Sequence, residues 1–163
     1  MSDVDDPCEL LERRRSRELT SHFRAFACAC CRRIWEHLTP ELRYGVEVAE
    51  QYLVGTADDH MRKCAGDKVR RECIYVDGDS SAADRYSGFA AEAALSCLFG
   101  DDDYPPIPTY GTTCAIATSR AVVEVVYAFT EMRGCCERSC EETAKRERNW
   151  QCQLISELFE NRE

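Results

Sequence analysis

Cysteine is the residue type that gives this chain most of its chemical potential, since 12 of the 163 residues are cysteines. Thiolates are soft ligands that suit Cu(I) or zinc, and reactive thiols also carry redox chemistry. Cys28 and Cys31 would lie one turn apart on a helix, and Cys136 and Cys140 share a helix face at a spacing of four residues. Each pair could supply half of a metal site, because a closed zinc site has four ligands.

A third half-site is His60 with Cys64, which also stand four residues apart on one helix face, beside Met61. Metal sites can be assembled from the facing helices of a bundle. The candidate metal ligands, with copper or zinc as the cofactor, are therefore Cys28, Cys31, Cys136, Cys140, His60 and Cys64.

A packing role explains the same cysteines more simply. Free cysteine is among the most buried residue types and behaves as a small hydrophobe. On a helix that turns about 100° per residue, Cys28, Cys30 and Cys31 spread over more than half of the circumference, so all three cannot bind one ion. We therefore expect that the cysteines mostly fill space between helices and that the protein has no cofactor. Soft-metal binding or thiol-redox chemistry remains the alternative.

Apolar residues recur at helical spacing along most of the chain, and no strand alternation appears. The clearest pattern spans 23–38, where Phe23, Phe26, Cys30 and Ile34 share one face. Further helices are expected from Pro7, at about 40–53, from Ala57, and at about 82–99, 113–132 and 136–159. We predict an all-α fold, a single compact bundle-like domain of five to six helices over residues 1–163. A chain of this length can bury a core without metals or disulfides.

Side chains that accept hydrogen bonds from a first helical turn mark the expected helix starts: Asp6, Thr39, Thr56 and Ser81. Residues 1–6 are expected to be disordered. Residues 100–112 are acidic and hold three prolines, so we expect the one long loop there, as a linker or an exposed contact surface.

Motifs for catalysis are missing from the sequence: there is no nucleophile elbow, phosphate loop, zincin motif or dinucleotide fingerprint. A Cys–His nucleophile pair needs its side chains within about 3 Å. His22 and His37 lie some four turns apart on the expected helix and cannot act together. Asp101–Asp103 could attract a cation, although solvated carboxylates are the simpler interpretation. We expect a protein that is not an enzyme.

Charge and composition exclude further classes of function. The net charge of −9 opposes nucleic-acid binding, which needs a positive surface. No apolar run approaches the roughly 20 residues that cross a bilayer, so we expect no membrane partner. The acidic start of the sequence lacks the features of a signal peptide. These observations predict a cytoplasmic protein whose cysteines are reduced thiols.

Three segments resemble a group of proteins from Gemmata-like planctomycetes: Phe26-Ala-Cys-Ala-Cys-Cys-Arg-Arg-Ile-Trp35, Val46-Glu-Val-Ala-Glu50 and Gln151-Cys-Gln-Leu-Ile-Ser-Glu-Leu-Phe159. The resemblance implies a bacterial source. Members of that group often carry a further C-terminal segment, and no activity is established for them. The resemblance therefore assigns no functional residue to this chain.

By elimination, the sequence favours a non-catalytic interaction or regulatory domain that binds another protein. The features that favour it are the acidic balance of charge, the expected loop at 100–112 and the missing catalytic motifs.

Overall fold

The structure is a computed structural model that describes residues 6–74, 77, 79–99, 103 and 110–160. The described residues form seven α-helices and short 3₁₀ turns, without strands, which confirms the all-α class. The expected count of five to six helices is therefore slightly too low. The helices are α1 (Pro7–Arg13), α2 (Thr20–Arg33), α3 (Pro40–Leu53), α4 (Asp59–Arg70), α5 (Ala82–Leu98), α6 (Tyr110–Met132) and α7 (Glu137–Glu160).

Three of the four expected N-caps are confirmed, because each side chain accepts a hydrogen bond from a backbone N–H of its first turn. Asp6 accepts from Cys8 at the start of α1, and Thr39 accepts from Leu42 at the start of α3. Ser81 accepts from the N–H of Asp84 and donates to its carboxylate, which is a variant of the capping box.

The fourth cap is wrong by two residues. Asp58 caps α4 by accepting from the N–H of Met61 at 2.8 Å. The Thr56 hydroxyl instead donates to the carbonyl of Gln51 and so closes the end of α3. Gly55, the residue before Thr56, has a φ of 78°. It ends α3 in the left-handed conformation that glycine adopts readily.

Two other boundaries differ from the expected ones. The helix expected at 23–38 ends at Arg33 and is followed by a 3₁₀ turn, Trp35–His37, whose Trp35 carbonyl accepts a hydrogen bond from Arg43. α6 begins at Tyr110, inside the segment expected to be a loop. Most of that segment, like the start of the chain that was expected to be disordered, lies outside the described residues.

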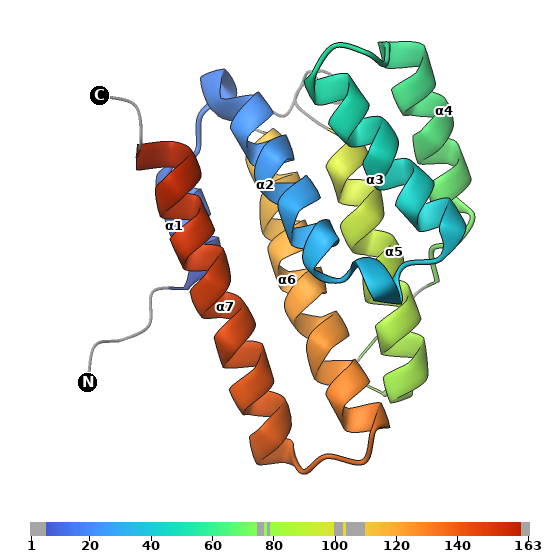
Figure 1. Cartoon of the computed structure of the whole chain (residues 1–163), viewed down its shortest axis with the longest axis vertical. Helices are drawn as coiled ribbons and strands as arrows, with labels where there is room; N and C mark the ends of the chain where they lie inside the picture. Colours follow the sequence, from blue (N-terminus) through green and yellow to red (C-terminus); the bar gives the residue numbers. More distant parts are fainter. Residues whose placement is uncertain (1–5, 75–76, 78, 100–102, 104–109, 161–163) are drawn as a thin grey trace.

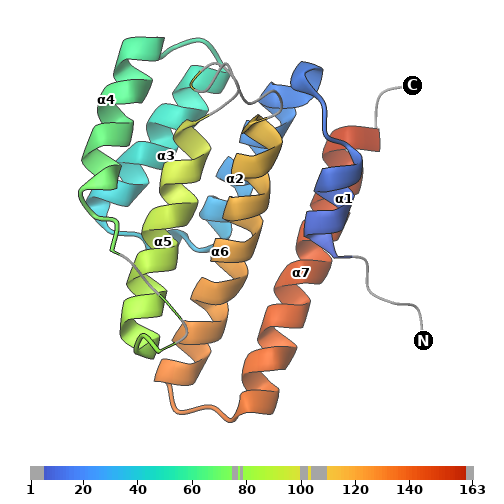
Figure 2. The same cartoon turned by 180° about the vertical axis from the view of Figure 1, so that it is seen from behind.

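Helix α6 lies at the centre of the bundle and packs against α1, α2, α5 and α7 (Figures 1 and 2). α3 and α4 form a second pair of helices on the α5 side, opposite α7 (Figure 1). The short α1 packs against α6 and α7, as the view from behind shows (Figure 2). The C-terminal end of α1 therefore lies beside the end of α7, and Arg14 forms a 2.6 Å ion pair with Glu160.

Small and apolar side chains fill the core between these helices. α5 contributes mostly alanines, which let it pack closely on α6 and α3. α6 between Gly111 and Met132 is long and apolar enough to cross a membrane by length and composition alone. More than half of its most apolar window (56%) is buried in the bundle, as expected of a core helix.

Candidate functional site

The C-x-x-C spacing of Cys28 and Cys31 on α2 places two thiols one turn apart, and Cys97 on α5 joins them. The Sγ atoms of Cys31 and Cys97 are 3.3 Å apart, and both side chains are fully buried. Cys97 can also donate to the carbonyl of Ala93. We call Cys28, Cys31 and Cys97 the thiol cluster.

The electrostatics of the thiol cluster favour neutral thiols. The neighbouring Cys97 thiol and burial raise the pKa of Cys28 far above its usual range. Burial is the main cause that raises the pKa of Cys97. At Cys31 the hydrogen bond with Cys97 acts to lower the pKa, but burial and the other thiols together outweigh it and the pKa is raised. At Cys97 the hydrogen bond with Cys28 also acts to lower the pKa, and burial outweighs it there too.

A groove on the outer side of α2 reaches the thiol cluster at Cys28, which is 3% exposed. The groove has a volume of about 670 Å³ and lies between α2, α3 and the middle of α7. We call it the α2 groove; its lining residues are Ala25, Cys28, Ala29, Arg32, Arg33, Glu50, Leu53, Val54 and Trp150.

Two arginines border the α2 groove, and each is held in place by a carboxylate and an indole ring. Arg32 donates two hydrogen bonds to Glu50, at 2.8 and 2.6 Å, and its guanidinium lies 3.8 Å from the ring centre of Trp35. Arg33 pairs with Glu147 at 3.3 Å and lies 4.7 Å from the ring centre of Trp150. These contacts fix both guanidinium groups before any ligand binds.

Glu147 also belongs to a buried network of hydrogen bonds between polar side chains. The Ser119 hydroxyl on α6 donates to Gln151 Oε1 at 2.6 Å, and Gln151 Nε2 donates to the Ser119 carbonyl and to Glu147. Burial raises the pKa of Glu147, although Arg33 opposes the shift. This hydrogen-bond network links α6 and α7 to α2.

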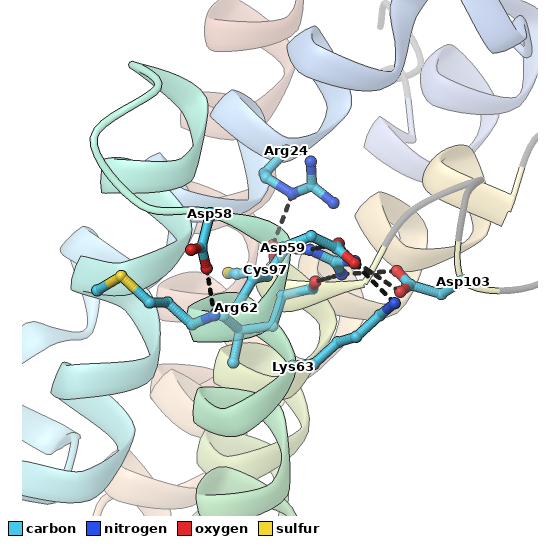
Figure 3. A network of polar contacts seen from close by, with 9 residues as sticks. Arg24, Asp58, Asp59, Arg62, Lys63, Cys97 and Asp103 are labelled. Carbon is cyan, nitrogen blue, oxygen red and sulfur yellow. Dashed lines mark hydrogen bonds and ion pairs between the residues drawn. The ribbon is translucent and has the colours of Figure 1, made fainter.

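A second charged network centres on Arg62 of α4, whose side chain is only 2% exposed. Its guanidinium donates two 2.7 Å hydrogen bonds to Asp103, and it also bonds to Asp59 and to the carbonyl of Leu98 (Figure 3). Arg24 lies nearby and donates to the carbonyl of Cys97 at 3.1 Å. Asp103 is 6% exposed, so the interpretation of Asp101–Asp103 as solvated carboxylates is wrong for this residue.

The two arginines of this region face one aromatic ring. The guanidinium groups of Arg24 and Arg62 lie 4.8 and 5.1 Å from the ring centre of Tyr52 on α3. The acceptors that bind Arg62 come from α4 itself, from the carbonyl of Leu98 and from Asp103. The network therefore serves to join α4 to the end of α5 and to the segment that holds Asp103.

The candidate metal ligands lie in three separate places. Cys28 and Cys31 are buried on α2. His60 and Cys64 are within 3.6 Å of each other on the exposed side of α4. Cys136 is exposed just before α7, and Cys140 is buried one turn later.

The structure does not join these three half-sites. Among the residues that the structure describes, no group of three or more histidine, cysteine, aspartate or glutamate side chains is arranged to hold a metal ion. Within the last pair the two thiols also differ, because hydrogen bonding with Ser139 lowers the pKa of Cys136, whereas burial raises that of Cys140.

Sequence reasoning missed Cys97 as a partner of the α2 thiols. Cys97 follows a run of alanines in the sequence, and nothing in the spacing of 66 residues could show that α2 and α5 meet there. Glu147 and Gln151 interrupt an apolar face of α7, and their role was also missed. Their spacing of four residues was the available signal that two polar groups point into the bundle together.

Comparisons of this chain with protein-family models, with curated proteins and with solved structures find no match.

Proposed function

We propose that this protein is a non-catalytic interaction domain of the cytoplasm that binds another protein through the α2 groove. The observation that carries the proposal is the combination of an apolar floor with two arginines already held in place at its border. Tryptophan and arginine are the side chains most enriched at the energetic centres of protein interfaces.

The floor of the groove supports an apolar contact. Val54 is 74% exposed and stands beside Leu53 and Trp150 on the groove lining. Ala25 and Ala29 leave space between these larger side chains. A partner that inserts one apolar side chain here would bury all of these groups at once, which is the main source of binding free energy.

The arginines at the border of the groove provide the polar contacts to a partner. Glu50 and Glu147 neutralise Arg32 and Arg33, so a strongly charged ligand gains little there. Each guanidinium has five N–H donors, more than its carboxylate partner uses. Backbone carbonyls that flank the inserted side chain of a peptide fit those donors. Because the arginines are fixed in advance, little side-chain entropy is lost on binding.

The positions of the histidines support a role without catalysis. The ring of His22 packs on Phe159, and His37 Nδ1 lies 3.0 Å from the hydroxyl of Tyr86. His60 lies near Cys64 on the exposed side of α4. The histidines therefore contact Phe159, Tyr86 and Cys64, and a Cys–His pair of the kind that cysteine hydrolases use is not formed by these contacts with the thiol cluster.

The test is selection of a random-peptide phage library on the wild-type protein, followed by binding measurements on Val54→Glu. We expect enriched peptides that share an apolar anchor, and a loss of affinity of at least about tenfold in the variant, because a carboxylate would enter the apolar contact. Ile74→Glu is the matched control, since Ile74 is also exposed but lies beyond the end of α4. Equal binding of the peptides by Val54→Glu and wild type would refute the groove as the interface.

A further inference from the structure

Two buried thiols from different helices lie close together in the core. Cys31 comes from α2 and Cys97 from α5, and their sulfur atoms are 3.3 Å apart. A disulfide bond needs a sulfur separation of about 2.05 Å, so the two atoms must approach by little more than about 1 Å. The two helices that carry these cysteines already pack against each other.

We propose that Cys31 and Cys97 are a redox-active pair that forms a reversible disulfide bond. The oxidant is a small peroxide that enters past Cys28 from the α2 groove. This inference concerns a modification site and does not depend on the partner of the groove. It assigns chemistry to two buried cysteines whose alternative role is packing alone.

The reaction balances with hydrogen peroxide as the oxidant. The Cys31 thiolate attacks one peroxide oxygen, the O–O bond breaks, and the product is a sulfenic acid with release of hydroxide, which takes up a proton as water. The Cys97 sulfur then attacks the sulfenic sulfur, the S–O bond breaks, and the Cys97 proton leaves with the oxygen as a second water. Two thiols lose two electrons in all, and one peroxide becomes two waters.

The geometry assigns different roles to the three thiols of the cluster. Cys31 belongs to α2, the helix that lines the groove, so it is the sulfur that meets the peroxide first, and Cys97 lies 3.3 Å behind it on α5. Cys97 is already in place to attack the oxidised sulfur. Cys28 lines the α2 groove and belongs to the same turn of α2 as Cys31, so it stands between solvent and the pair.

The charges around the cluster are compatible with this chemistry. The guanidinium of Arg24 lies on the same side of α2 and interacts electrostatically with Cys28, and its Nε–H is bonded to the Cys97 carbonyl. This positive charge acts to lower the pKa of Cys28, against the larger effects of Cys97 and burial. Burial opposes the thiolate, so we expect slow oxidation that requires sustained peroxide rather than a fast peroxidase reaction.

The test is peroxide treatment of the folded protein, followed by blocking of free thiols, proteolysis and mass spectrometry. A background in which the exposed Cys64, Cys135 and Cys136 are replaced by serine keeps surface reactions out of the measurement. We expect a peptide that links the α2 cysteines to the α5 cysteine, and its disappearance after treatment with dithiothreitol. The link should be absent in Cys31→Ala and in Cys97→Ala, and it should persist in the matched variant Cys30→Ala, which removes another fully buried thiol of α2.

Two variants of Cys28 test the route of entry, and circular dichroism checks that every variant is folded. Cys28→Ala removes the sulfur at the groove floor and should speed formation of the link, whereas Cys28→Leu fills the space and should slow it. The proposal is overturned if the folded protein forms no link between Cys31 and Cys97 under peroxide that oxidises Cys136 in the unmodified chain. It is equally overturned if the protein, purified under reducing conditions, carries stoichiometric copper or zinc that Cys97→Ala releases, because the cluster would then be a metal site.

Discussion

Two glycines in neighbouring helices should respond to the same substitution with opposite signs. A Cβ atom on Gly45 of α3 would lie 2.5 Å from Cγ2 of Val69 and 3.3 Å from Cδ1 of Leu98. Val69 is fully buried and β-branched, so it cannot turn away cheaply. We expect Gly45→Ala to lower the free energy of unfolding by about 1–3 kcal/mol despite the better helix propensity of alanine. Urea unfolding followed by circular dichroism measures the change.

Gly66 of α4 is the control. A Cβ there would meet only Cζ of Phe99, at an ordinary contact distance of 3.7 Å. Gly66→Ala should therefore stabilise the protein by about 0.5–1 kcal/mol, the propensity gain alone. The double variant Gly45→Ala, Val69→Ala should not lose the sum of its two single effects, because Val69→Ala makes room for the new methyl group. A stabilising Gly45→Ala would show that α3 and α4 can separate without cost.

At the scale of helices, the boundaries that could be predicted were those set by local chemistry. Asp6, Thr39 and Ser81 cap their helices through neighbours three residues away or fewer, and such contacts can be inferred from spacing. The boundary at Trp35–His37 could not, because Arg43 from the next helix satisfies the Trp35 carbonyl. The start of α6 inside the Pro-rich segment also escaped prediction.

The candidate site shows the same difference between local contacts, which could be predicted, and long-range contacts, which could not. The proximity of Cys28 and Cys31 could be predicted because both residues belong to one helix. The approach of Cys97 to Cys31 depends on how α5 packs on α2, which no local pattern records. No local pattern indicates that Arg62 is buried, because its partner Asp103 reaches it from 41 residues further along the chain.

Among the charged contacts of α4, the ion pair of Arg62 with Asp103 should contribute most to the free energy of unfolding. Asp103→Asn removes one charge from a pair whose two side chains are 2% and 6% exposed, and its amide N–H₂ would face the guanidinium donors. Loss of one partner of a buried pair typically costs about 3–5 kcal/mol. We expect a loss of about 3 kcal/mol in the free energy of unfolding, measured with guanidinium chloride.

Asp59→Asn is the matched control, because Asp59 bonds to the same guanidinium but is 50% exposed. Exposed ion pairs contribute about 0–1 kcal/mol, so this variant should lose less than about 1 kcal/mol. The double variant Arg62→Leu, Asp103→Leu should recover much of the loss, because no unpaired charge then stays buried. Equal losses in Asp103→Asn and Asp59→Asn would mean that the Asp103 pair is no stronger than a surface contact.

At the scale of the whole molecule, the buried carboxyl of Glu147 couples the packing of three helices to pH. It is 4% exposed, it accepts from Gln151, which is bound to Ser119 of α6, and it pairs with Arg33 of α2. Burial is the dominant influence and raises the pKa of Glu147 above its ordinary value of 4.5. The folded protein therefore holds this proton more tightly than the unfolded chain does.

The sign of the pH effect follows from linkage. Below pH 4.5 Glu147 is protonated in both states and costs nothing. As the pH rises from 4.5 through the higher pKa of the folded state, the unfolded chain releases the proton first, and this residue's contribution to stability falls. We expect Glu147→Gln, which cannot ionise, to gain stability relative to wild type across that range. Unfolding in urea at a series of pH values measures the difference.

Arg33 supplies the control from the opposite direction. Its charge lowers the pKa of Glu147 against the effect of burial, so Arg33→Gln should raise that pKa further. The fall in stability with rising pH should then be steeper than in wild type and extend to higher pH, whereas Glu147→Gln flattens it. Parallel pH profiles for wild type, Arg33→Gln and Glu147→Gln would mean that water reaches Glu147 in the folded state, and α2, α6 and α7 would then pack independently of its charge.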